Sequence, residues 1–116
     1  VFCTTFANSE TAEALTVAKA MIHEDEGLSL IMERSDAVRL GYIFDSTLSQ
    51  ITLMVYSSLE GVGLTSAVSS ALAQRGIACN MVAGMPHDHL FVPARRAKDA
   101  LNALLALQSE AQAHMP

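Results

Sequence analysis

The spacing of hydrophobic residues changes near the middle of the chain, from the period of a strand to that of a helix. Residues 50–56 alternate, with Ile51, Leu53 and Val55 on one face, as in a half-buried strand. Over residues 63–75 the apolar positions instead follow one face of a helix. The pattern therefore predicts a strand that leads through a short loop into a helix.

Similar patterns divide the rest of the chain. The remaining strands are predicted over residues 1–6, 28–33, 77–83 and 89–92, and the remaining helices over residues 9–18, 37–40 and 94–108. Residues 23–26 form an acidic cluster that we interpret as a solvated turn. Residues 42–49 are predicted to be a loop.

One strand and its following helix are repeated along the chain. Leu30 can be aligned with Leu90 without gaps. The same alignment brings Ala37 onto Ala97. This correspondence of pattern indicates an internal duplication.

The order of the predicted elements from Gln50 onward indicates a fold class. Strand, helix, strand, strand and helix is the ferredoxin-like order without its last strand. An unpaired sheet edge beside an apolar core needs a partner, which could be residues 28–33, residues 1–6 or a second chain. We therefore expect an α/β fold, with antiparallel sheet covered by helices, in a homodimer or larger homo-oligomer.

The loop between the central strand and helix contains two glycines, Gly61 and Gly63. Glycine permits backbone conformations closed to other residues, and the first N–H groups of a helix have no partner within the helix. An anion is therefore favoured at this end of the helix. The alternative is a tight turn without a ligand, because the spacing GxG lacks the third glycine of a dinucleotide fingerprint and no phosphate-loop lysine follows.

Composition limits the function further. Of the 116 residues, 51% are hydrophobic, but no apolar run is long enough to span a bilayer and no signal segment opens the chain, so we expect a cytoplasmic protein with no membrane partner. A net charge of −5 without a basic stripe argues against a nucleic-acid partner. Cys3 and Cys79 lie in apolar segments and are expected to be reduced core thiols. Because Val1 already lies inside an apolar run, we expect that an initiating segment is missing before it.

Several longer motifs are too specific to arise by chance. The runs SSLEGVGLTSAVSSALAQRGIACNMVAG and HDHLFVP resemble the small bacterial ACT-domain proteins of unassigned function, whose usual runs are SSLEAVGLTAAV and GISxNVVAGYYHDHIFVP. The upstream run EDEGLSLIMER resembles their EGLTLVLE segment. The chain departs from the family at Gly61, where alanine is usual, and at Met85 and Pro86, where two tyrosines are usual.

The resemblance implies two ACT-like units of ferredoxin-like βαββα fold, a partial one over residues 1–49 and a second over residues 50–116. ACT domains generally bind amino acids or other small effectors where the first strand passes through a loop into the first helix. On this chain the implied ligand-binding residues are Ser57, Ser58, Gly61, Val62, Gly63, Leu64 and Thr65, with Asn80 on the neighbouring strand. A ligand carboxylate would meet the first N–H groups of the helix, and Asn80, Asp88 and loop carbonyls are the candidate acceptors for an amine.

Other functions stay open at this point. His87 and His89 flank Asp88, so on an extended strand both imidazoles would project to one face and could begin a zinc or copper site. Otherwise the two histidines form hydrogen bonds across the hairpin. An enzyme could use Asp88 with a histidine, but no nucleophile, base and orienting group occur together. A pure assembly module is the third alternative. We expect a non-enzymatic regulatory protein that binds a small-molecule effector and needs no cofactor.

Overall fold

The chain divides into two compact units. The computed structural model describes residues 1–6, 11–54 and 63–113. The first unit is Val1–Thr47 and the second is Leu48–Pro116. Each unit has a three-stranded antiparallel sheet and a buried apolar core of its own.

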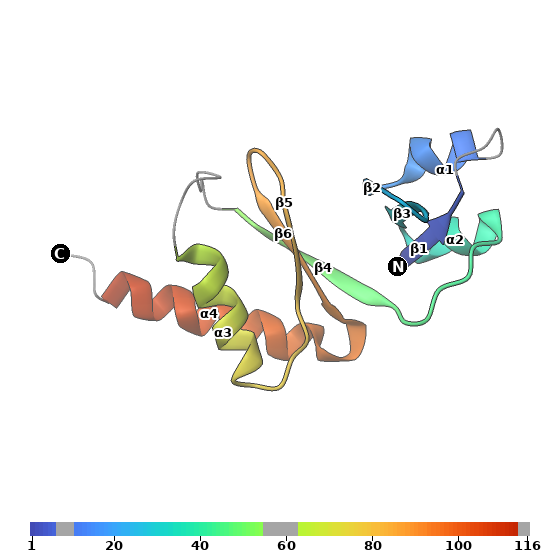
Figure 1. Cartoon of the computed structure of the whole chain (residues 1–116). Helices are drawn as coiled ribbons and strands as arrows, with labels where there is room; N and C mark the ends of the chain where they lie inside the picture. The colour runs from blue at the N-terminus through green and yellow to red at the C-terminus, as the bar shows by residue number, and fades with distance from the viewer. Residues whose placement is uncertain (7–10, 55–62, 114–116) are drawn as a thin grey trace. The chain divides into compact units, whose positions relative to one another are not determined.

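The first unit has the order βαββα (Figure 1). Its elements are β1 (Phe2–Thr5), α1 (Ala12–Val17), β2 (Ala20–Glu24), β3 (Gly27–Ile31) and α2 (Arg34–Leu40). The strand order is β1-β3-β2, so β3 is the central strand. Leu30 on β3 lies opposite Cys3 on β1 and Met21 on β2. Leu30 and Cys3 point to the face that the two helices cover, because both belong to the core of the unit.

A polar contact joins the two helices of the first unit. The guanidinium of Arg39 at the end of α2 donates to the carboxylates of Glu13 on α1 and Asp36. Gly41 then ends α2 with a φ of 79°, the left-handed conformation that glycine adopts without steric cost. The core beneath consists of six buried residues: Val1, Cys3, Ala14, Leu30, Met32 and Ala37.

The second unit repeats the same order with longer helices. Its elements are β4 (Leu48–Leu53), α3 (Leu64–Ala73), β5 (Asn80–Ala83), β6 (Asp88–Pro93), a short 3₁₀ helix (Ala94–Arg96) and α4 (Ala97–Ala113). The strand order is β4-β6-β5, the counterpart of the order in the first unit. Figure 1 shows α3 and α4 packed beside each other and against the sheet.

Helix and sheet meet in one apolar core in the second unit. The buried residues come from both helices, from β6 and from the segment after α3: Val68, Leu72, Ile77, Leu90, Val92, Ala100 and Ala103. Ile51 and Leu53 of β4 pack against this cluster, as the alternating pattern predicts. Val55, the third member of that face, lies outside the described residues.

The predicted fold class is confirmed: both units are α/β, with antiparallel sheets covered by helices in the ferredoxin-like arrangement. The predicted solvated turn over residues 23–26 is partly wrong. His23 and Glu24 belong to β2, and Asp25 and Glu26 alone form the turn. The strand was missed because most of its side chains are exposed, so no alternation marks it in the sequence.

The predictions for the sheet edge of the second unit are also corrected. Residues 28–33 and residues 1–6 were both candidates for its fourth strand. In the structure β3 and β1 belong to the first sheet, and the second sheet has three strands among the described residues. Neither candidate therefore closes that edge, and pairing with a second chain stays a prediction.

Other boundaries shift by a few residues. β4 begins at Leu48, inside the predicted loop, and β5 begins at Asn80 rather than at residue 77. The predicted strand began too early because the apolar run starts at Ile77, which is buried in the core although it precedes the strand. The predicted cap of the first helix, Ser9, lies outside the described residues. No helix in the described ranges is long and apolar enough to cross a membrane.

Candidate functional site

The start of α3 is exposed among the residues that the structure describes. Gly63 precedes the helix with a φ of 105°, and no atom of the described residues lies within 4 Å of the position that a β-carbon would occupy there. Its carbonyl accepts the first helical hydrogen bond, from the N–H of Ala67 at 2.8 Å. Because the N–H groups of the first turn have no partner within a helix, this end of α3 favours a negative group.

Asp88 lies at the end of the sheet where β4 ends. In the register, Asp88 is opposite both Leu53, the last residue of β4, and Ala83, the last residue of β5. Side chains alternate along a strand, so Asp88 shares a face with Leu90, which is in the core that the helices cover. Only 8% of Asp88 is exposed. A carboxylate therefore lies on the helix-bearing face, at the strand end that leads towards α3.

The other predicted ligand-binding residues fall into three groups. Ser57, Ser58, Gly61 and Val62 lie outside the described residues. Leu64 is half-buried and packs against the core, and Thr65 is exposed on the first turn of α3. Asn80 is opposite Phe91, an odd number of residues along β6 from Asp88. The register therefore brings Asn80 to the opposite face of the sheet from Asp88.

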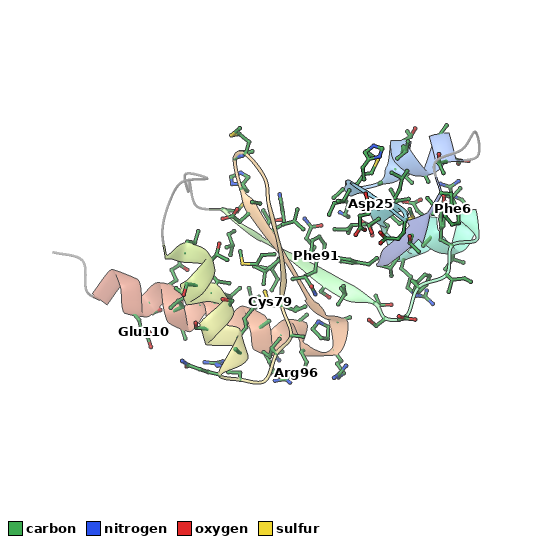
Figure 2. All side chains as sticks on the ribbon, in the orientation of Figure 1. Phe6, Asp25, Cys79, Phe91, Arg96 and Glu110 are labelled. Carbon is green, nitrogen blue, oxygen red and sulfur yellow. The ribbon has the colours of Figure 1, made fainter. Side chains whose placement is uncertain are left out.

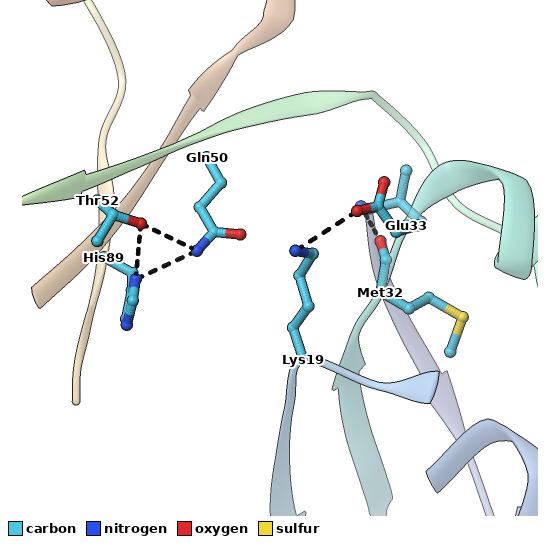
Figure 3. Close-up of polar contacts among 7 residues, drawn as sticks. Lys19, Met32, Glu33, Gln50, Thr52 and His89 are labelled. Atoms are coloured by element: carbon cyan, nitrogen blue, oxygen red, sulfur yellow. Dashed lines mark hydrogen bonds and ion pairs between the residues drawn. The ribbon is translucent and has the colours of Figure 1, made fainter. Parts of the chain in front are cut away.

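His89 is part of a polar cluster on that opposite face (Figure 3). Its Nδ1 lies 3.1 Å from Nε2 of Gln50 and 3.1 Å from Oγ1 of Thr52. Thr52 is its direct neighbour across β4 and β6, so the contacts follow from the strand register. The ring is thereby fixed to the sheet through Nδ1.

Gly84 makes room for the turn between β5 and β6, which ends at His87. Its N–H donates to the carbonyl of His87 at 2.9 Å. A β-carbon at Gly84 would lie 2.6 Å from that carbonyl oxygen and 3.3 Å from Nε2 of His89. The close approach of backbone and imidazole therefore requires glycine at this position.

The geometry does not favour a metal site at His87 and His89. His87 precedes β6 and is half-buried, whereas His89 lies within the strand with Nδ1 engaged. Among the residues that the structure describes, no three histidine, cysteine, aspartate or glutamate side chains gather closely enough to hold a metal ion. The alternative was that both histidines form hydrogen bonds across the hairpin. The observed contacts of His89 are instead with Gln50 and Thr52 on β4, on the other side of β6 from the hairpin strand β5.

Both cysteines are free thiols in apolar surroundings. Cys3 is buried in the first core, and Cys79, labelled in Figure 2, packs against the second. Burial raises the pKa of the Cys79 thiol. Burial also raises the pKa of the Cys3 thiol, partly offset by the nearby N-terminal ammonium. Raised pKa values leave little nucleophilic thiolate at neutral pH, which does not favour a catalytic role.

Sequence reasoning assigned no role to residues 42–49, yet part of this segment lines a cleft in the first unit. Ile43 and Phe44 are bulky apolar residues in an irregular segment, and Ile43 is 91% exposed. No motif marks the region in the sequence, where its one unusual feature is two adjacent bulky apolar residues within a predicted loop.

Comparison with known proteins gives a consistent result for both units. One ACT-domain family model matches residues 46–106, and a second matches residues 1–49. No curated protein matches the chain.

The similar solved structures include the following two. A protein of unknown function from Vibrio cholerae, described as a possible transport protein, is 40% identical with a TM-score of 0.81; the match covers 92% of this chain and 81% of that one. The aspartokinase alpha and beta subunits are 13% identical with a TM-score of 0.63, covering 92% of this chain and 88% of that one. The second likeness shows the fold alone.

Proposed function

The chain belongs to the ACT-domain family, and from this premise we propose that it is a non-enzymatic regulatory protein whose second unit binds an amino acid beside the start of α3. ACT domains are generally regulatory modules that bind small molecules. The observation that carries the proposal is the position of Asp88: a carboxylate on the helix-bearing face, at the strand end that leads towards an open helix N-terminus. An amino acid has an ammonium group that can pair with Asp88 and a carboxylate that can bind at the helix N-terminus.

The carboxylate of the ligand lies against the first turn of α3. The unpaired N–H groups and the positive end of the helix act together on an anion, and the absence of a side chain at Gly63 lets the ligand approach the backbone. Thr65 is exposed on the same turn and its hydroxyl can add a hydrogen bond. Ser57, Ser58, Gly61, Val62 and Leu64 complete the proposed lining.

The ammonium of the ligand binds Asp88. A carboxylate accepts several hydrogen bonds at once, so Asp88 can keep its other contacts while it accepts one more. Because Asn80 lies on the other face of the sheet, Asp88 is the better acceptor of the two side chains proposed. Opposite charges at two sites also explain why an amino acid fits better than a phosphate.

The test is calorimetry of the full chain with the common amino acids, supported by thermal unfolding. A ligand that binds only the folded state at one hundred times its Kd stabilises the protein by about 2.7 kcal/mol. Gly63→Val places a branched side chain over the first turn of α3 and should abolish binding. Asp88→Asn removes the charge at nearly constant shape and should weaken it.

Gly76→Val is the matched control for Gly63→Val. Gly76 lies beyond the other end of α3, also at positive φ (69°), and there too no atom lies within 4 Å of the place that a β-carbon would take. Both substitutions therefore place a β-branched residue at positive φ and cost backbone strain in the folded state. If Gly63→Val folds and binds the amino acid as tightly as Gly76→Val does, the loop is not the site.

We also propose that two chains associate. ACT domains often form oligomers, and each sheet ends in edge strands without a partner strand among the described residues. Association through such edges protects the unpaired backbone groups from non-specific pairing.

A further inference from the structure

A cleft of about 310 Å³ opens on the first unit, and none of its lining residues belongs to the proposed amino-acid site. It is lined by two neighbouring strands and by the segment after α2: Phe2, Cys3, Thr4, Ser29, Ile43, Phe44 and Asp45. Phe2, Thr4 and Ser29 project from the sheet face opposite the helices, because they alternate with the core residues Cys3 and Leu30. A volume of this size is at the lower end of the range for small-molecule sites.

The walls of the cleft are mainly apolar and aromatic. Phe2 is 41% exposed and Ile43 is 91% exposed, which is a large apolar surface to leave in water. The guanidinium carbon of Arg34 lies 5.7 Å from the centre of the Phe44 ring. The Phe44 ring therefore already carries a positive group of the chain itself on one face. A ligand for this cleft therefore needs an apolar body.

The polar groups of the cleft select the charge of the ligand. Among the lining residues Asp45 is the charged one, and its side chain is exposed. The hydroxyl of Ser29 donates to the carboxylate of Glu24, which brings a second negative group close to the cleft. Arg34 is not among the lining residues. Carboxylates beside aromatic rings are the surroundings that bind organic ammonium ions, through ion pairing and cation–π attraction.

We propose that this cleft is a second ligand site, which binds an organic ammonium ion with an apolar body, such as an aralkylamine. The apolar body packs between Phe2, Ile43 and Phe44, and the ammonium lies against Asp45. The site shares no residue with the proposed amino-acid site, because all its lining residues belong to the first unit.

The test is an NMR titration of the full, isotope-labelled chain with phenethylammonium. The backbone amides of Thr4, Ser29 and Asp45 should shift, whereas those of the first turn of α3 should not. The probe 2-phenylethanol has the same ring and chain without the charge, and it should bind at least about threefold more weakly. Asp45→Asn should reduce the affinity for phenethylammonium about threefold to fivefold, near the upper end of what is expected for an exposed ion pair.

Asp25→Asn is the matched control. Asp25 is exposed in the turn between β2 and β3, labelled in Figure 2, and its substitution makes the same change of net charge outside the lining of the cleft. The affinity of Asp25→Asn should equal that of the wild type. A salt titration of the wild type tests the same point without a variant. Added salt should weaken the binding of phenethylammonium and leave the binding of 2-phenylethanol unchanged.

Three results would each overturn the proposal. The amides of the first unit could remain unshifted, the alcohol could bind as tightly as the ammonium, or Asp45→Asn could behave like Asp25→Asn. Shifts confined to the start of α3 would also refute the cleft, while leaving the proposed amino-acid site standing.

Discussion

Leu30 and Leu90 occupy the same position in the two sheets. Each is fully buried on the central strand of its unit, and each lies directly opposite a methionine of the next strand, Met21 for Leu30 and Met81 for Leu90. Leu30 and Leu90 are separated by as many residues along the chain as Met21 and Met81 are, in agreement with the alignment that indicated a duplication. The repeat is therefore one of topology and register as well as of sequence pattern.

The packing of α3 on the second sheet can be tested by Leu72→Ala. Leu72 is fully buried, so the substitution leaves a cavity as well as removing apolar contacts, and we expect a loss of about 2–5 kcal/mol in the free energy of unfolding. Leu105→Ala is the control, because Leu105 is 51% exposed and its truncation should change stability by less than about 0.5 kcal/mol. Equal effects in urea unfolding would contradict the assigned core.

Gly84→Ala should destabilise the β5–β6 hairpin by about 1–3 kcal/mol, because its β-carbon overlaps the carbonyl of His87. The backbone contact at 2.6 Å is closer than the contact with the His89 ring at 3.3 Å. Removing the ring with His89→Ala should therefore not rescue Gly84→Ala. A double-mutant cycle measured by chemical unfolding checks this, and a large favourable coupling would mean that the imidazole is the obstacle.

Stability should fall at alkaline pH partly through the cysteines. Burial raises the pKa of Cys3 and Cys79 above the ordinary value of 9.0, so the folded chain favours the neutral thiols. Their contribution is complete below pH 9.0 and is lost as the pH rises through the higher pKa values of the folded state. Other groups also titrate there, so the measurement is the difference in pH slope between the wild type and Cys79→Ala. Parallel slopes would show that burial of Cys79 does not perturb its thiol.

Zinc or copper should leave the melting temperature unchanged. His89 is engaged through Nδ1 with Gln50 and Thr52, and no third ligand approaches it within the described parts of the chain. Thermal unfolding with each metal and with a chelator checks this. If a metal stabilises the wild type and the double variant His87→Ala, His89→Ala loses the effect, the metal alternative is correct.

The assembly can be measured by light scattering. We expect a particle of twice the chain mass of 12.4 kDa, or a larger multiple, because the edge strands need partners. A monomer at high protein concentration would contradict the proposed association.

Sequence reasoning was most successful where the hydrophobic pattern is strong. The alternation at Ile51 and Leu53 and the helical spacing after Leu64 identified β4 and α3, because burial of one face leaves a clear period. β2 has no such period, since its side chains are mostly exposed, and its existence depends on pairing with β3. Strand pairing of this kind is a long-range property that local pattern does not encode.

The candidate site shows the same limit. The motif around Gly63 indicated a ligand loop, and the structure supports an open helix start there. The position of Asp88 relative to Asn80, however, depends on the register of β5 against β6, which decides the face of every side chain. The cleft at Phe44 depends on how the segment after α2 lies beside β1, and no motif marks it.

The shared strand order also has a consequence for how each unit folds. In both units the central strand pairs with its immediate predecessor through a short turn, at residues 25–26 and 84–87, and hairpins of this kind form in about 1–10 μs. The first strand of each unit is instead separated from its partner by a helix and a strand along the chain. In the first unit, for example, Phe2 of β1 pairs with Ile31 of β3. Closing that longer loop costs more chain entropy and should come later. β1 and β4 are thus the strands whose docking completes each unit, and a folding intermediate would contain the hairpin without them.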